Sequence, residues 1–184
     1  MNYKPILIVA GEPNSVFFEI FFKSIKSKKF KSPLILIASK NILDLQMKKL
    51  NFKREIKIIE LKNIKNQKID NSSINLINVS FNQKKPFEKI SYKSNNYIHN
   101  CFSIALNLID KGISHKLING PISKKSFLKN KYLGVTEYLS KKSNTKHDAM
   151  LIFNKKLSVC PLTTHLPLSK VAKKISKQLI TNKV

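Results

Sequence analysis

The stretch Leu162-Thr163-Thr164-His165-Leu166-Pro167-Leu168 decides how the chain folds, because it places one histidine between a strand-like apolar run and a helix begun by proline. Proline suits the first position of a helix. In α/β proteins, the loop that follows a strand is where ligands bind. His165 is therefore the first candidate for a functional residue, and a surface or capping imidazole is the alternative. The apolar residues that repeat at helical spacing over 166–180 are Leu168, Val171, Ala172, Ile175 and Leu179.

The residues before this stretch predict a β-hairpin. Two short apolar runs, 149–153 and 157–160, are separated by Asn154, Lys155 and Lys156. Short β-prone runs joined by a few polar residues are typical of two antiparallel strands and their turn. His165 then lies in the loop at a strand end.

Apolar runs of strand length alternate with helical patterns along the rest of the chain, which predicts an α/β fold. The region 61–91 is rich in Asn, Lys and Ser and is expected to be loop with one embedded strand. The expected strands are 5–10, 33–38, 55–60, 74–79 and 116–119, and the expected helices are 14–26, 41–50, 95–111 and 166–180.

The composition fits a cytoplasmic globular protein. Hydrophobic residues make up 42% of the 184 residues, enough for a proper core. The apolar runs are too short to cross a bilayer, and the first ten residues are typical of a strand and not of a signal peptide. Cys101 and Cys160 are too few for a disulfide framework or a zinc knuckle and are expected to be buried thiols.

The glycines exclude two common nucleotide-binding motifs. The chain has only four glycines, at positions 11, 112, 120 and 134. It therefore contains neither the Gly-x-Gly-x-x-Gly fingerprint of a Rossmann fold nor a phosphate-binding P-loop.

The charge would ordinarily indicate a partner such as nucleic acid. The chain has 35 Lys and Arg against 10 Asp and Glu, a formal net charge of +25. Arg54 is the only arginine, however, and the lysines are spread along the whole chain. Base recognition and bidentate phosphate contacts favour arginine. We therefore interpret the charge as compositional drift on solvated faces, and expect no specific nucleic-acid partner and no membrane partner.

Four short motifs, in order and spacing, resemble the 4-hydroxythreonine-4-phosphate dehydrogenase family of vitamin B6 biosynthesis. The first is Gly-Glu-Pro-Asn-Ser at 11–15 with Glu19 after it, and the second is Leu-Ile-Asn-Gly-Pro-Ile-Ser-Lys at 117–124. The third is Gly-Val-Thr-Glu-Tyr-Leu at 134–139, and the fourth is the Thr-Thr-His-Leu-Pro-Leu segment at 163–168. The resemblance covers essentially the whole chain.

The resemblance implies a fold and an activity. The fold is an isocitrate- or isopropylmalate-dehydrogenase-like α/β/α sandwich, which binds its nicotinamide cofactor without the Rossmann fingerprint. The activity is the NAD-dependent oxidation of 4-phosphooxy-L-threonine, followed by decarboxylation to 3-amino-2-oxopropyl phosphate, on the way to pyridoxal phosphate. The implied oxidoreductase is a homodimer in the cytoplasm that takes a small phosphorylated amino acid as substrate.

The resemblance also implies a divalent metal ion, which is zinc, magnesium or cobalt. Such an ion suits both chemical steps, because it stabilises negative charge on the reacting oxygen. The histidine of the family's Thr-Thr-His segment is a metal ligand and corresponds to His165. Neutral imidazole is a suitable ligand at neutral pH.

The substrate-binding positions match only in part. The family usually has Gly-His-Thr-Glu where this chain has Gly134, Val135, Thr136 and Glu137. Thr136 keeps the hydroxyl that contacts substrate, or else caps the helix after it. Val135 stands at the position of the family's histidine and cannot form a hydrogen bond through its side chain. Lys124 is a candidate for a substrate phosphate or carboxylate, with a solvated lysine as the alternative.

Glu12 and Asn14, in the first strand-to-helix turn, either line the same cleft or serve as turn and cap residues. The catalytic residues and those that contact the cofactor are not assigned.

The length of the chain departs from the family. Two further metal-binding histidines and several substrate-phosphate ligands come from a carboxy-terminal half that this chain lacks, whereas a catalytic metal normally needs about three protein ligands. His147 lies at the entry to the expected hairpin. In an antiparallel hairpin the start of one strand lies beside the end of the next, so His147 is the one other histidine that could share an ion with His165. We therefore expect residues 1–184 to be the amino-terminal portion of such a domain, spanning parts of two subdomains, in a truncated form whose own activity is open. The alternative is a catalytically inactive, lysine-rich α/β protein with affinity for polyanions.

Overall fold

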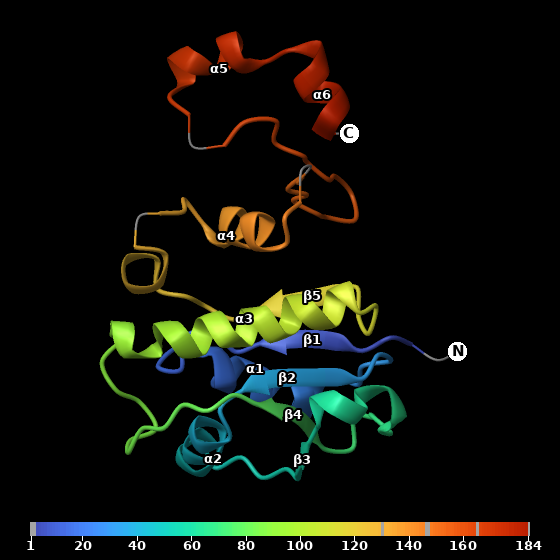
Figure 1. Cartoon of the computed structure of the whole chain (residues 1–184), viewed down its shortest axis with the longest axis vertical. Helices are drawn as coiled ribbons and strands as arrows, with labels where there is room; N and C mark the ends of the chain where they lie inside the picture. Colours follow the sequence, from blue (N-terminus) through green and yellow to red (C-terminus); the bar gives the residue numbers. More distant parts are fainter. Residues whose placement is uncertain (1–2, 130, 146–147, 165, 184) are drawn as a thin grey trace. The chain divides into compact units, whose positions relative to one another are not determined.

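The computed structural model describes residues 3–129, 131–145, 148–164 and 166–183. The chain divides into two compact units, Met1–Phe127 and Leu128–Val184. The first unit contains a β-sheet flanked by helices, and the second contains short helices and extended segments (Figure 1). In the part of the chain that the structure describes, no helix is long and apolar enough to cross a membrane.

The first unit is built on a five-stranded sheet in which every pairing is parallel. The order of the strands is β3-β4-β2-β1-β5, so the chain moves from β1 toward one edge and returns to the other side of β1 with β5. The strands are β1 (Ile6–Val9), β2 (Leu34–Ala38), β3 (Ile56–Ile58), β4 (Ile74–Asn78) and β5 (Lys116–Asn119).

Helices cover both faces of this sheet. On one face, α1 (Phe17–Ser27) and α2 (Lys40–Lys49) pack on the alternate residues of the central strands, among them Leu36 and Leu76. The intervening strand residues, such as Ile35 and Ile37, point to the second face of the sheet and are also fully buried. The helix α3 (Asn95–Asp110) lies on this second face (Figure 1). The central strands are therefore apolar throughout, as expected of a parallel sheet buried on both sides, and the predicted α/β/α sandwich is confirmed.

The helix α1 is held by an aromatic cluster. Phe18 and Phe22, one helical turn apart, are almost completely buried. The Phe22 ring stacks on Phe52, with 4.4 Å between ring centroids. The helix begins later than the predicted residue 14, because the backbone first makes a turn in which the Ser15 N–H donates to the Glu12 carbonyl at 3.2 Å.

Local signals also set the ends of α2 and α3. The Ser39 hydroxyl accepts a hydrogen bond from the Ile42 N–H at 3.4 Å, as an N-cap serine does. After α3, Gly112 has a φ of +69° and stands just past the C-cap Lys111, where a glycine commonly ends a helix. The 61–91 region is less regular than α2 and α3 but is not all loop, because it contains the 3-10 helix η1 (Leu61–Asn66) besides β4. A second 3-10 helix, η2 (Tyr92–Ser94), leads into α3.

The second unit first corrects the predictions of a hairpin and of a buried Cys160. The expected hairpin over 149–160 is reduced to a single antiparallel bridge between Ile152 and Val159, with backbone hydrogen bonds of 2.8 and 2.9 Å. Cys160 follows this bridge and is half-buried, so the prediction of a buried thiol on a strand is wrong. Cys101, in contrast, is completely buried in α3.

The expected helix over 166–180 is instead two helices, α5 (Leu168–Lys174) and α6 (Lys177–Lys183). Ile175 is extended, and the Ser176 hydroxyl accepts from the Leu179 N–H at 3.1 Å. Serine competes with helix continuation in this way, because its side chain satisfies the N–H groups of a new first turn. Pro167 is the N-cap of α5 and not its first helical residue.

Candidate active site

The turn after β1 and the loop after β5 meet backbone to backbone at the carboxyl edge of the sheet. The Glu12 N–H donates to the Pro121 carbonyl at 2.8 Å, and the Gly120 N–H donates to Val9 at 2.7 Å. Two glycines allow this approach. A Cβ atom on Gly11 would lie 2.3 Å from the Pro121 oxygen, and one on Gly120 would lie 2.1 Å from the Ala10 oxygen. Because the chain reverses its direction across the sheet at β1, this edge is where open α/β sheets bind ligands.

Glu12 is buried beneath this edge and acts as a turn residue. It is 2% exposed, and its Oε1 accepts from the backbone and side-chain nitrogens of Asn14 at 3.3 and 3.4 Å. Its Oε2 accepts from the Ser94 hydroxyl at 2.9 Å. In the described part of the chain, no lysine lies within ion-pair distance of this carboxylate. The structure thus favours the alternative in which Glu12 is a turn residue. A carboxylate buried this deeply supports the loops around the site and does not line its surface.

Asn14 links the same turn to the segment before α3. Its Oδ1 accepts from the Gln83 side chain at 3.1 Å and from the Glu88 N–H at 2.8 Å. These contacts fix the 83–88 loop next to the carboxyl edge. Asn14 is therefore also a turn residue, and the structure brings it together with Glu12 as the sequence predicted.

Gln46 is a buried polar residue that the sequence reasoning missed. Its Nε2 donates to the carbonyls of Pro13 and Pro86 at 2.7 and 2.8 Å, so it joins the β1–α1 turn to the 83–88 loop. Its Oε1 is buried and has no hydrogen-bond partner among the described residues. A signal was available, because Gln46 stands one turn after Ile42 on the apolar stripe of α2, where a polar residue needs a partner.

Tyr97 and Cys101 lie on α3 where it covers this edge. The Tyr97 hydroxyl accepts from the Ser39 N–H at 3.1 Å. Burial raises the pKa of Tyr97 well above its usual value and raises the pKa of Cys101 to about 12. Both groups therefore stay neutral near neutral pH, and Cys101 has none of the thiolate character that a nucleophile needs.

Lys124 lies beyond the carboxyl end of β5. It is the first residue of η3 (Lys124–Leu128), a single π-helical turn, and its side chain is exposed. The Ser126 N–H and the Phe127 N–H donate to Ser123 at 3.1 and 2.8 Å, which shapes the backbone around it. An exposed lysine at this position can meet an anionic group, but it equally fits the alternative of a solvated lysine.

Val135 and Thr136 belong to the second unit and begin the helix α4 (Val135–Lys142). The N-cap is Gly134, in extended conformation, so the alternative of Thr136 as a capping residue is wrong. Thr136 is half-buried and makes no side-chain hydrogen bond within the described residues. Its hydroxyl is thus available to a ligand. Val135 is also half-buried, so a larger polar side chain would reach solvent there.

The α4 helix has an aromatic anchor. Tyr138 is buried and packs edge-on against Tyr132, with 5.4 Å between ring centroids. Burial, followed by the neighbouring Tyr132, raises the pKa of Tyr138 to about 12. The anchor therefore remains neutral and holds the first turn of α4, including Thr136, in place.

The two histidines considered as metal ligands, His165 and His147, lie outside the described residues. Around the first of them, Thr164 and Leu166 are exposed. Within the described ranges, no group of three or more His, Cys, Asp and Glu side chains could hold a metal ion. The assignment of a metal to His165 stays a prediction.

Comparison with known proteins identifies relatives of this chain. The sequence model of the family described as pyridoxal phosphate biosynthetic protein PdxA matches residues 29–184. The 4-hydroxythreonine-4-phosphate dehydrogenase of Sulfurihydrogenibium is 31% identical over 186 residues, which cover 97% of this chain and 55% of the relative. That of Aquifex aeolicus is 31% identical over 189 residues, covering 98% and 56%. The chain spans about half the length of the curated relatives it matches.

Solved structures confirm the fold. A 4-hydroxythreonine-4-phosphate dehydrogenase from Burkholderia phymatum superposes with a TM-score of 0.84 at 21% identity, over 97% of this chain and 55% of that one. The enzyme of the same name from Klebsiella pneumoniae gives a TM-score of 0.79 at 21% identity, over 97% and 56%.

Proposed function

Because the chain belongs to the family of the pyridoxal phosphate biosynthetic protein PdxA, we propose that it forms part of an NAD-dependent dehydrogenase acting on 4-phosphooxy-L-threonine. The observation that carries this proposal is the match to two curated dehydrogenases over at least 97% of the chain. The reaction oxidises the secondary alcohol to a ketone, and decarboxylation then gives 3-amino-2-oxopropyl phosphate. The protein would act in the cytoplasm as a homodimer.

Thr136 is the residue we expect to contact substrate. Its hydroxyl is not used by its own helix, and the buried Tyr138 fixes the turn on which it stands. A hydroxyl on a rigid element can hold a polar group of the substrate in one orientation. Val135 supplies shape but no hydrogen bond, so one contact that the family histidine makes is lost or comes from elsewhere.

Lys124 would neutralise the phosphate or carboxylate of the substrate. It follows the carboxyl end of β5, on the side of the sheet where ligands of α/β folds bind. Glu12, Asn14 and Gln46 would act beneath this surface, because their hydrogen bonds fix the loops that surround it.

The described residues do not form a complete site for the proposed metal ion. Within those residues no three ligands come together, whereas a catalytic metal ion needs about three protein ligands. His165 would supply one ligand, and the others would come from the region of the relatives beyond the match. A divalent zinc, magnesium or cobalt ion bound there would stabilise charge on the reacting oxygen.

A growth test examines this proposal. A bacterial strain that lacks the dehydrogenase and requires pyridoxine receives either the 184-residue chain or a fusion of this chain to the unmatched region of the Aquifex aeolicus relative. We expect the fusion alone to restore growth. Thr136→Val, which keeps the shape and removes the hydroxyl, should abolish the rescue, and Thr136→Ser should retain it. A soluble fusion without rescue, or full rescue by Thr136→Val, contradicts the proposal.

A further inference from the structure

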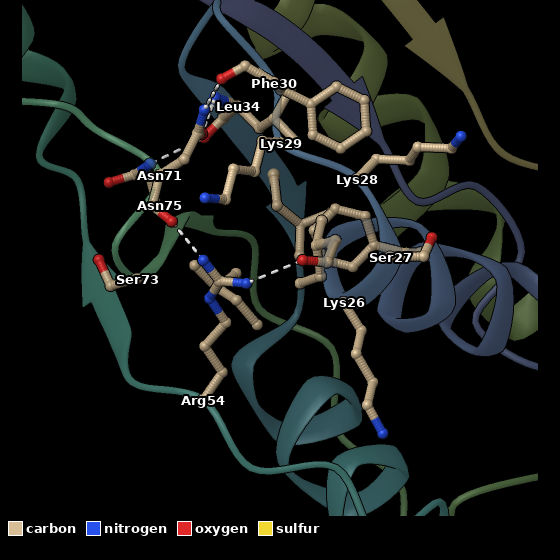
Figure 2. Close-up of a pocket in the computed structure, with 14 residues that line it drawn as sticks. Lys26, Ser27, Lys28, Lys29, Phe30, Leu34, Arg54, Asn71, Ser73 and Asn75 are labelled. Carbon is tan, nitrogen blue, oxygen red and sulfur yellow. Dashed lines mark hydrogen bonds between the residues drawn. The ribbon is translucent and has the colours of Figure 1, made fainter.

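A pocket lies in the first unit at the amino ends of β2 and β4 (Figure 2). Its volume is about 550 Å³, within the range of small-molecule sites. The strands β2 and β4 begin at Leu34 and Ile74, and both of these residues line it. The pocket is therefore at the opposite edge of the sheet from the candidate active site. Five-residue strands separate the two edges by roughly 13 Å.

The floor of the pocket is apolar. It is formed by strand residues of the α1 face of the sheet, Leu34, Leu36 and Ile74, together with Phe21 and Ile25 of α1. All of these except Ile25 are buried, so the floor belongs to the hydrophobic core and is not a mobile surface. A flat apolar group that enters the pocket would lie on this floor and lose contact with water.

The rim is cationic. Four basic residues line the pocket, and none of its described lining residues is acidic. In Figure 2, the side chain of Lys29 points inward over the pocket, whereas those of Lys26 and Lys28 point outward. None of these lysines, nor Arg54, has a carboxylate within ion-pair distance in the described part of the chain. Their charge is thus available to an anionic ligand.

Arg54, the only arginine of the chain, anchors one wall. Its guanidinium donates to the Ile25 carbonyl at 3.2 Å and to the Asn71 carbonyl, and so joins the end of α1 to the segment before β4. Arginine has five N–H donors, so further donors remain for a ligand. The three donors of a lysine ammonium rotate about one nitrogen and lack the planar fork by which Arg54 holds the two carbonyls.

Asn71 fixes the loop at the mouth of the pocket. Its Oδ1 accepts from the Leu34 N–H at 2.9 Å, and its Nδ2 donates to the Phe30 and Ser32 carbonyls at 3.0 and 2.9 Å. The loop that carries Lys28 and Lys29 is thereby tied down before any ligand arrives. A rim ordered in advance reduces the entropy that binding costs.

We propose that this pocket binds a small planar aromatic molecule that carries a phosphate or carboxylate group. The ring lies on the apolar floor, and the anionic group meets Lys29 and the remaining donors of Arg54. Because this site and the dehydrogenase site lie at opposite edges of the sheet, the ligand can bind while substrate is bound. The site is independent of the proposed function and takes a second ligand.

Calorimetry of phenyl phosphate binding to the 184-residue chain tests this site. The salt concentration is about 0.15 M, which screens non-specific attraction between the anion and the many surface lysines. Inorganic phosphate tests the charge alone, and phenol tests the ring alone. We expect phenyl phosphate to bind with a 1:1 stoichiometry and about tenfold more tightly than either, since burial of the ring adds to the ionic contact. Benzoate binding more tightly than phenyl phosphate would support the site and identify the anion as a carboxylate.

Variants locate the binding. Lys29→Gln should weaken phenyl phosphate binding about fivefold, because one ionic contact is lost. Lys31→Gln removes the same charge from an exposed neighbour that does not line the pocket, and should leave binding unchanged. Ser27→Trp, at the exposed mouth, should block entry without touching the core. Equal affinities for phenyl phosphate and inorganic phosphate, or equal effects of the two lysine changes, would overturn the proposal.

Discussion

Replacing Gly120 by alanine should destabilise the first unit, because the backbone leaves no room for a methyl group. The new Cβ would lie 2.1 Å from the Ala10 oxygen and 2.7 Å from Cδ2 of Phe17. A carbon–oxygen contact normally needs about 3.3 Å, so the loop after β5 must move away by roughly 1 Å.

This movement has a calculable cost. It stretches the hydrogen bonds from Gly120 to Val9 and from Glu12 to Pro121, now 2.7 and 2.8 Å long. Each is worth about 1 kcal/mol net, and overpacking adds about 1–3 kcal/mol. We therefore expect Gly120→Ala to lower the free energy of unfolding by about 3 kcal/mol.

Gly112→Ala is the matched control. Gly112 has a φ of +69° but no atom within 4 Å of an added Cβ, so its substitution should cost only about 1 kcal/mol for the left-handed backbone. The assay follows labelling of the buried Cys101 thiol as urea increases, in a Cys160→Ser background, because Cys101 reports on the first unit. If Gly120→Ala proves no more destabilising than Gly112→Ala, the close packing at the carboxyl edge is refuted.

Three further predictions follow from burial. Glu12→Ala should lower the free energy of unfolding by about 2–3 kcal/mol, since Asn14 and Ser94 lose their acceptor. Glu12→Gln keeps an oxygen for Asn14, so it should cost less than about half of that amount. If the two variants lose the same free energy of unfolding in urea denaturation, Glu12 is not the hydrogen-bond acceptor that holds this turn. Burial raises the pKa of Cys101 from 9.0 to about 12, so its contribution to the free energy of unfolding is fully present below about pH 9 and is lost as pH rises toward 12, by roughly 1 kcal/mol at pH 10. Cys101→Ala should make this alkaline decline shallower, whereas the buried Tyr97 hydroxyl still contributes to it, and an unchanged slope would show that the thiol has no part in the decline. Val135→His should lower the free energy of unfolding by under about 1 kcal/mol, because the half-buried position leaves a path to solvent, and a loss near 3 kcal/mol in urea denaturation followed by circular dichroism would instead mark the position as core.

The elements of the first unit were largely predictable from the sequence because their signals are local. The residues 116–119 form β5 as expected, and α3 begins at Asn95 and ends within one residue of the prediction. In the second unit, Ser176 interrupts an apolar repeat that looked continuous, and the hairpin keeps only the Ile152–Val159 bridge. A hydrophobic repeat shows which face a helix can bury, but not whether a serine will start a new first turn.

The candidate site was predictable only in part. The turn residues Glu12 and Asn14 could be found from their place after the first strand, and the structure joins them. Gln46 makes its hydrogen bonds to Pro13 and Pro86, which are 33 and 40 residues away in the sequence. Such a partnership depends on which loops the strand order brings together, and a single sequence does not reveal that order.

Turnover by the fusion to the unmatched region of the Aquifex aeolicus relative tests the central proposal most directly. Formation of NADH from 4-phosphooxy-L-threonine is followed by absorbance, with and without a divalent metal ion, for the unchanged fusion and for His165→Ala. The proposal predicts metal-dependent turnover that His165→Ala abolishes while the circular dichroism spectrum stays the same, because its neighbours Thr164 and Leu166 are exposed and a change at an exposed segment contributes little to stability. Full activity in the His165→Ala fusion, or robust turnover by the 184-residue chain alone, would contradict it.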